Sequence, residues 1–232
     1  MIPWVQLDSA PIPGEPDALR LMRRGTEFSI KVGAAELMNS RLSGSEKALS
    51  ALTRARLRDP SRARVLIGGL GMGFTLRAAL GDFGPQARIV VAELIPAVAA
   101  WARGPLAHLF EGSLDDPRVE LRVEDVRQTI ASGPARYDAI LLDVDNGPEG
   151  LTQRANDRLY DSAGLMRAHR ALRPGGVLAV WSSGPDSKFS ARLQRVGFKV
   201  EEARVHANGG AGRRHVLWFA RRAEEPASFN LR

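Results

Sequence analysis

The sequence predicts a doubly wound α/β domain built on a mostly parallel sheet, and three observations predict it. From Arg64 onward, short apolar runs alternate with helical patterns, and neighbouring parallel strands need such crossover connections. Residues 65–80 read VLIGGLGMGFTLRAAL, which indicates an apolar strand, a glycine-rich turn and the start of a helix. Glu93 then ends a second apolar run, where a carboxylate can accept hydrogen bonds from ribose hydroxyls.

The composition excludes several classes of protein. A length of 232 residues accommodates one domain, or one domain with a small appendage. The chain has no cysteine, which rules out disulfides, thiolate metal sites and a cysteine nucleophile. Its four histidines are not spaced as metal ligands, so we expect no bound metal. We find no signal-peptide pattern and no apolar run long enough to span a bilayer, and expect a cytoplasmic protein without a membrane partner.

The net charge of +7 comes mostly from arginines scattered along the chain. The densest group lies in residues 54–64 and could contact phosphates. A solvated helix surface is the favoured interpretation, because charge runs usually form such faces. Few aromatic residues lie between these arginines, which argues against a stacking platform for single-stranded nucleic acid. Nucleic acid is therefore not the expected partner.

The first 62 residues are predicted to form a lead-in and a small appendage. Four prolines, at positions 3, 11, 13 and 16, favour an irregular lead-in over residues 1–26. The segment EFSIKVGAAELM at residues 27–38 predicts a short β-hairpin around Gly33. Apolar residues at helical spacing predict a helix over residues 45–58. The appendage is thus a hairpin and a helix spanning residues 27–62.

Residues 63–222 are predicted to form the main domain, followed by a tail at residues 223–232. Seven apolar runs predict strands at residues 64–67, 88–92, 119–123, 137–142, 177–181, 199–205 and 216–220. Five helical patterns lie between them, at residues 75–80, 97–103, 126–131, 163–172 and 188–196. The last two strands are joined by a glycine-containing loop without a helix, so they should pair antiparallel at one side of the sheet.

Seven strands that end in an antiparallel pair resemble the class I S-adenosylmethionine-dependent methyltransferases, with their Rossmann-like sheet. The segment LRPGGVLAVW at residues 172–181 adds to this resemblance, because Pro174 stops a helix and the two glycines after it permit the reversal into a strand. Within this superfamily, the spermidine synthase-like group is the better match. The chain resembles it in the pattern GG-x-G-x-G-x-TLR at residues 68–77, the acidic residue after the second strand, the Glu-Asp pair at 124–125 and the loop DVDNGPEG at 143–150. The hairpin ahead of a helix containing Ser45 and Glu46 is similar to the N-terminal appendage of that group.

The glycine loop and Glu93 indicate a nucleotide-type ligand, and the resemblance implies that it is S-adenosylmethionine or decarboxylated S-adenosylmethionine. Gly69, Gly71 and Gly73 are expected to line the amino-acid and ribose end of this cofactor, since glycines let the backbone approach a ligand closely. Glu93 is expected to accept hydrogen bonds from both ribose hydroxyls. Glu124 and Asp125 are expected at the adenine end. Capping of the helix that follows is an equal alternative for Asp125, because aspartate is a preferred cap.

Asp143 is the candidate catalytic residue. It follows the apolar strand YDAILL, so it should emerge in the crevice at the carboxyl edge of the sheet. A carboxylate there can take a proton from a nucleophile or hold a cationic amine until it loses its proton. The alternative for Asp143 is a structural role in capping the loop backbone. Three further residues are candidates for binding the substrate: Asp145, Asn146 and Tyr160.

Two departures from the spermidine synthase-like pattern decide the predicted reaction. That group usually carries an aspartate in the glycine loop, where this chain has Met72, and a second aspartate three residues after the catalytic one, where this chain has Asn146. These changes favour methyl transfer to a small-molecule nucleophile, with tighter binding of S-adenosylmethionine than of its decarboxylated form. Aminopropyl transfer in polyamine biosynthesis is the alternative, and a catalytically silent cofactor-binding protein is the second alternative. A homodimer is a further expectation.

Overall fold

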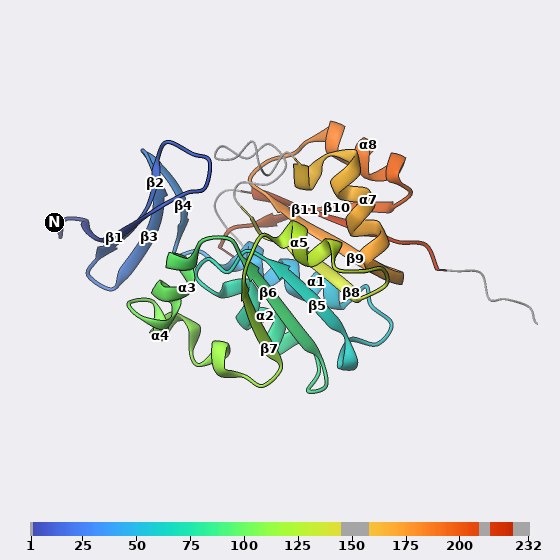
Figure 1. Cartoon of the computed structure of the whole chain (residues 1–232), viewed down its shortest axis with the longest axis horizontal. Coiled ribbons are helices and arrows are strands. Elements are labelled where there is room, and N and C mark those ends of the chain that lie inside the picture. Colours follow the sequence, from blue (N-terminus) through green and yellow to red (C-terminus); the bar gives the residue numbers. More distant parts are fainter. Residues whose placement is uncertain (1, 145–157, 209–213, 225–232) are drawn as a thin grey trace, which may run out of the picture.

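The computed structural model describes residues 2–144, 158–208 and 214–224 of the chain. These residues form two sheets that lie side by side, with helices on both faces of the larger one (Figure 1). The small sheet is antiparallel in the order β1-β2-β3-β4. Its strands are β1 (Val5–Pro11), β2 (Ala18–Arg24), β3 (Glu27–Val32) and β4 (Ala35–Asn39).

The small sheet corrects the prediction for the N-terminus. Strands β3 and β4 pair around the turn at Gly33 as the predicted hairpin, but the expected irregular lead-in is wrong, because β1 and β2 extend this hairpin to four strands. The side chains of Leu19 and Leu21 are buried in β2 and supply the apolar face. The prolines do not prevent this pairing. Pro11 ends the edge strand β1, where proline is tolerated, and the others lie outside the strands.

The large sheet has the order β10-β11-β9-β8-β5-β6-β7. Only β11 runs against its neighbours, and it pairs antiparallel with both β9 and β10. The predicted seven-stranded, doubly wound sheet with a closing antiparallel pair is therefore confirmed. Its strands are β5 (Arg64–Gly68), β6 (Arg88–Glu93), β7 (Val119–Val123), β8 (Tyr137–Leu142), β9 (Leu172–Ser182), β10 (Lys199–His206) and β11 (Arg214–Arg221).

Helices cover both faces of the large sheet, because successive strand residues point to opposite sides. Val65 and Ile67 of β5 pack with α1, α2 and α3, whereas Leu66 between them packs with α5, α7 and α8. The helices are α1 (Gly44–Arg54), α2 (Phe74–Asp82), α3 (Pro96–Arg103), α4 (Ala107–Phe110), α5 (Val126–Ala131), α7 (Ser162–Ala171) and α8 (Ser187–Val196). Within the described residues, no helix has both the length and the apolar character needed to cross a membrane.

Helix α1 belongs structurally to the large sheet, although the sequence grouped it with the hairpin. It packs against α2 and β9, and its N-terminal Gly44 N–H donates to the carbonyl of Ala207 at 2.9 Å. The small sheet is tied down separately, since the indole Nε1 of Trp101 in α3 donates to Asp8 in β1 at 2.6 Å. As a result, α1 and the small sheet both lie next to the carboxyl ends of the central strands.

The turn after β5 brings three strand ends together. The Gly69 N–H donates to the carbonyl of Ala92 at 2.9 Å, and the Asp143 N–H donates to the carbonyl of Gly68 at 3.0 Å. Gly69 has a φ of +91°, and a Cβ at this position would lie 2.4 Å from the carbonyl oxygen of Asp143. Any larger residue would therefore push the ends of β5 and β8 apart.

We expect Gly69→Ala to lower the free energy of unfolding by about 2–4 kcal/mol, from left-handed backbone strain and the clash with a backbone oxygen. Gly81→Ala is the matched control. Gly81 lies inside α2, a Cβ added there would meet nothing within 4 Å, and its φ is not in the left-handed region. Urea denaturation should show Gly81→Ala to be neutral or stabilising by up to about 1 kcal/mol. Equal stability of the two variants would contradict the close approach of the two strand ends.

Candidate active site

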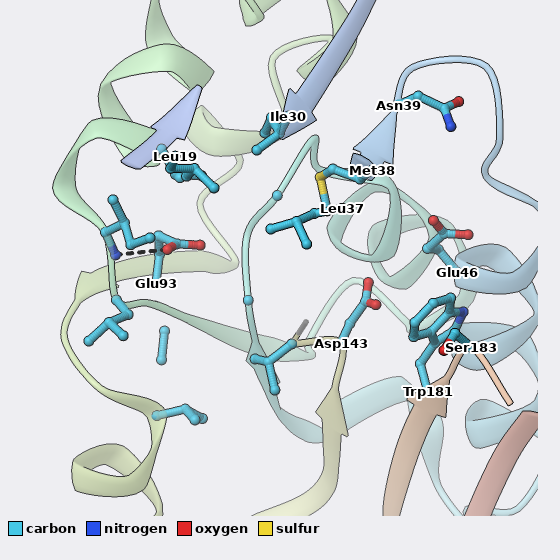
Figure 2. A pocket seen from close by; sticks show the side chains of 18 of the residues that line it. Leu19, Ile30, Leu37, Met38, Asn39, Glu46, Glu93, Asp143, Trp181 and Ser183 are labelled. Atoms are coloured by element: carbon cyan, nitrogen blue, oxygen red, sulfur yellow. Dashed lines mark hydrogen bonds between the residues drawn. The ribbon is translucent and has the colours of Figure 1, made fainter. Parts of the chain in front are cut away.

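A cavity of about 320 Å³ lies between the small sheet and the carboxyl ends of β5, β6 and β8 (Figure 2). This is where the strand order reverses, and ligands bind at such switch points in open α/β sheets. The small sheet contributes apolar side chains to the cavity, among them Leu19, Ile30, Leu37 and Met38. The large sheet contributes the loops and acidic residues that the sequence singled out.

Glu93 lies at the end of β6 and fixes two loops at the cavity wall. Its side chain is buried, yet it lines the cavity. One carboxylate oxygen accepts a hydrogen bond from the Leu70 N–H at 2.9 Å, and the other accepts one from the Ile95 N–H at 2.8 Å. The carboxylate therefore joins the glycine loop after β5 to the turn before α3. Its orientation is set by the backbone before any ligand arrives.

The glycines of the predicted loop have different surroundings. Gly69 and Gly71 line the cavity, and a Cβ on Gly71 would lie 2.4 Å from the Cε of Met38. Gly73 is not among the lining residues, because it caps α2 and packs against the ring of Phe110. The prediction that it lines the cofactor is therefore corrected. Met72 is fully buried and is also absent from the cavity wall.

The acidic pair after β7 is split between two roles. Asp125 lines the cavity and also caps α5, since it accepts a hydrogen bond from the Arg127 N–H at 2.8 Å. Burial raises the pKa of Asp125, but hydrogen bonds from the side chain and backbone of Arg127 outweigh it, so the pKa is lowered overall. Glu124 is not among the lining residues and accepts a hydrogen bond from the Thr129 hydroxyl at 2.6 Å. Of the two residues expected at the adenine end, only Asp125 lines the cavity.

Asp143 follows β8 and points into the cavity (Figure 2). Its Oδ2 accepts a hydrogen bond at 2.6 Å from the hydroxyl of Thr75, which lies in the first turn of α2. Burial raises the pKa of the Asp143 carboxyl, and the hydrogen bond from Thr75 offsets part of this rise. The side chain therefore lies where the sequence placed it, and the raised pKa makes its carboxylate a stronger base than a solvated one.

Glu46 is a further carboxyl that lines this cavity, and it is not among the site residues predicted from sequence. It lies in the first turn of α1, and its Oε2 accepts a hydrogen bond from the Ser45 hydroxyl at 2.7 Å. Burial, together with the charge of Asp143, raises the pKa of Glu46 to about 7. A signal was present in the sequence. Glu46 has the helical spacing of the buried residues Leu49 and Thr53, which is unusual for a surface glutamate.

The structure places none of the three predicted substrate-binding residues in the described cavity wall. Asp145 and Asn146 lie outside the described residues. Tyr160 is fully buried and its ring packs edge-on against Phe189 at a centroid distance of 5.7 Å. The prediction that Tyr160 binds the substrate is therefore wrong, because its side chain packs inward. Trp181, near the end of β9, also lines the cavity, although it was not among the predicted site residues.

Comparisons with known proteins agree with this architecture. No protein-family model matches the chain. The polyamine aminopropyltransferase 2 of Pseudomonas aeruginosa is 36% identical over 144 residues, which cover 59% of this chain and 39% of that protein. The polyamine aminopropyltransferase of Mycobacterium tuberculosis is 32% identical over 157 residues, which cover 64% of this chain and 29% of that protein. The chain thus spans less than half the length of these curated relatives.

Solved structures give the same result for the fold. The spermidine synthase from Thermotoga maritima matches with a TM-score of 0.75 at 17% identity, over 96% of this chain and 74% of that one. A spermidine synthase in complex with the transition-state analogue AdoDATO matches with a TM-score of 0.74, also at 17% identity, with the same coverage. At this identity the structures support the fold alone. Together with the sequence relatives, they confirm the resemblance to the spermidine synthase-like group.

The raised pKa of Glu46 makes stability depend on pH. A carboxyl that binds its proton more tightly in the folded state than in the unfolded state stabilises the protein while it is protonated. This stabilisation is lost as the pH rises from the unfolded-state pKa to the folded-state pKa. For Glu46 this interval runs from 4.5 to about 7. When the pH rises from 5 to 8, we expect the free energy of unfolding of the wild type to fall by about 2–3 kcal/mol relative to that of Glu46→Gln.

Urea denaturation of both proteins across this pH range measures the difference. Burial and the nearby Arg222 lower the pKa of His169, and the effect of its titration on stability has the opposite sign. Since His169 is present in both proteins, the comparison cancels it. A difference between the two proteins that does not change with pH would contradict the raised pKa of Glu46.

Proposed function

We propose that the chain is a transferase that moves the aminopropyl group of decarboxylated S-adenosylmethionine to a primary amine. One observation carries the proposal: the Asp143 carboxyl points into a cavity that Glu93 also lines. The relatives of this chain that support it are named polyamine aminopropyltransferases. The sequence favoured methyl transfer, with aminopropyl transfer as the alternative. These relatives favour aminopropyl transfer.

The donor fits the half of the cavity around the glycine loop. Glu93, already oriented by two backbone N–H groups, would accept hydrogen bonds from the ribose hydroxyls. Gly69 and Gly71 would let the backbone approach the sulfonium end. Asp125 would contact the adenine amine while it caps α5. The cavity volume of about 320 Å³ lies within the range typical of ligand pockets.

The reaction needs one proton transfer and one displacement. The acceptor ammonium gives a proton to the Asp143 carboxylate and becomes a neutral amine. The nitrogen lone pair then forms a bond to the methylene carbon beside the sulfonium, while the electrons of the breaking carbon–sulfur bond move to sulfur. The thioether leaves neutral, so no general acid is needed. Alignment of nitrogen, carbon and sulfur supplies most of the rate, and the base contributes about 10²–10⁴-fold.

Met72 bears on the choice of donor. Because it is buried away from the cavity wall, residue 72 offers no charge to a donor amine. Several carboxyls line the cavity, and their negative charge would favour an aminopropyl ammonium group over the carboxylate of S-adenosylmethionine. Methyl transfer from S-adenosylmethionine is the second candidate, and the identity of Met72 is the observation that favours it.

Calorimetry with the two donors tests the proposal. We expect decarboxylated S-adenosylmethionine to bind at least tenfold more tightly than S-adenosylmethionine, because the cavity presents carboxyls to the donor tail. Glu93→Gln should weaken donor binding by about 10–100-fold, the loss of charged hydrogen bonds worth about 1.5–3 kcal/mol. Glu120→Gln should leave it unchanged, since Glu120 lies on β7 outside the cavity lining and pairs with Arg122.

Two results would contradict the proposal. A tenfold preference for S-adenosylmethionine would favour methyl transfer instead. Failure of the folded wild type to bind either compound would remove the cavity as a donor site. The melting transition of Glu93→Gln shows whether a loss of affinity reflects the site or the fold.

A further inference from the structure

We propose that Glu46 and Asp143 together bind the ammonium group of the acceptor, and that Glu46 releases a proton to solvent when this group arrives. The proposal deepens the function proposed above and rests on it. It assigns the acceptor end of the cavity to α1, a helix of the N-terminal region.

The two carboxyls reach the same space from different elements. Glu46 comes from the first turn of α1 and Asp143 from the end of β8, and both line the cavity. Figure 2 shows them on the same side of the cavity, below Met38 and next to Trp181. Each accepts a hydrogen bond from a neutral hydroxyl, Ser45 for Glu46 and Thr75 for Asp143. Within the described residues, neither forms an ion pair.

A buried N–H in the wall of the same cavity is an independent indication of a ligand. The side chain of Trp181 lines the cavity and is 8% exposed. Its Nε1 is buried and has no hydrogen-bond acceptor among the residues that the structure describes. Buried polar groups are seldom left without a partner in native proteins. This N–H therefore indicates a polar occupant, and the apolar walls of Leu37 and Leu42 suit the methylene chain of an alkylamine.

The other charged groups around Glu46 do not replace a cationic ligand. Lys47 is adjacent in sequence and its charge slightly offsets the rise in the pKa of Glu46, but its side chain lines a different pocket. His215 lies 3.0 Å from the Ser45 hydroxyl. Glu36, on β4, accepts hydrogen bonds from Ser29 and Asn39. At the donor end, Arg127 is paired with Asp125. The acceptor end thus presents two carboxyls to a space that an ammonium group would complete.

The proton balance follows from the charge of the incoming group. Burial and the charge of Asp143 raise the pKa of Glu46 to about 7, so Glu46 is mostly protonated at pH 6. An ammonium group within hydrogen-bond distance favours the carboxylate form. Glu46–COOH and R–NH₃⁺ then give the ion pair of Glu46–COO⁻ with R–NH₃⁺, and one proton goes to water. Asp143 remains the group that takes the proton of the amine in the transfer step.

Calorimetry on protein saturated with 5′-methylthioadenosine, titrated with 1,4-diaminobutane, measures this release. The titration is run at pH 6.0 in two buffers with different ionisation enthalpies, and the difference in heat gives the protons released. We expect about one proton per amine bound for the wild type. Glu46→Gln should abolish the release and weaken amine binding at least tenfold. Trp181→Phe keeps an aromatic ring but removes the N–H, and should weaken binding by a smaller factor while the proton release persists.

The controls separate this inference from the proposed function. Glu120→Gln, on β7, should behave as the wild type. Amine binding in the wild type that releases no proton, or that Glu46→Gln does not weaken, would overturn the role of Glu46 and leave the proposed function standing. Failure of 5′-methylthioadenosine to bind, or of the amine to bind the loaded wild type, would overturn the proposed function itself. Melting curves and binding of 5′-methylthioadenosine to each variant establish that it is folded.

Discussion

Two carboxyls that line one cavity and form no ion pair among the described residues, Glu46 and Asp143, are the constraint on which this structure depends. A charge removed from water is costly unless it is paired or neutralised. The protein meets this cost with hydroxyl donors, from Thr75 to Asp143 and from Ser45 to Glu46, and with a proton retained by Glu46 up to a pH of about 7. The two carboxyls therefore have no ion-pair partner among the described residues, and the positive charge of an ammonium ligand would supply one.

The surrounding fold holds these carboxyls in position. The glycine at residue 69 lets the loop after β5 touch the carbonyl of Asp143, and Glu93 ties that loop to the turn after β6 through two backbone N–H groups. Helix α1 carries Glu46 and packs across α2 and β9. The small sheet closes the cavity with apolar side chains. Each contact is local, yet together they bring residues from four segments of the chain to one site.

The large sheet could be predicted from sequence, because each of its strands is a short apolar run with its own turn or helix signals. Asp143 and Glu93 followed from that prediction, since both end parallel strands. Strands β1 and β2 could not be predicted as easily, because prolines at their ends resemble an irregular segment while the alternation of Leu19 and Leu21 is short. The places of Glu46 and Trp181 in the cavity wall depend on how α1 and β9 pack. Helical spacing marks Glu46 as facing inward, but it does not show which cavity the side chain reaches. Gly73 belongs to the glycine motif and Tyr160 follows the loop at residues 143–150, but both pack inward.

The reaction itself is the most direct test of this account. Mass spectrometry of the protein incubated with decarboxylated S-adenosylmethionine and 1,4-diaminobutane should detect the aminopropylated amine and 5′-methylthioadenosine in equal amounts. Asp143→Asn should form both at least about 100-fold more slowly, with donor affinity within a few-fold of the wild type. A methylated amine formed from S-adenosylmethionine, or undiminished transfer by Asp143→Asn, would contradict the account.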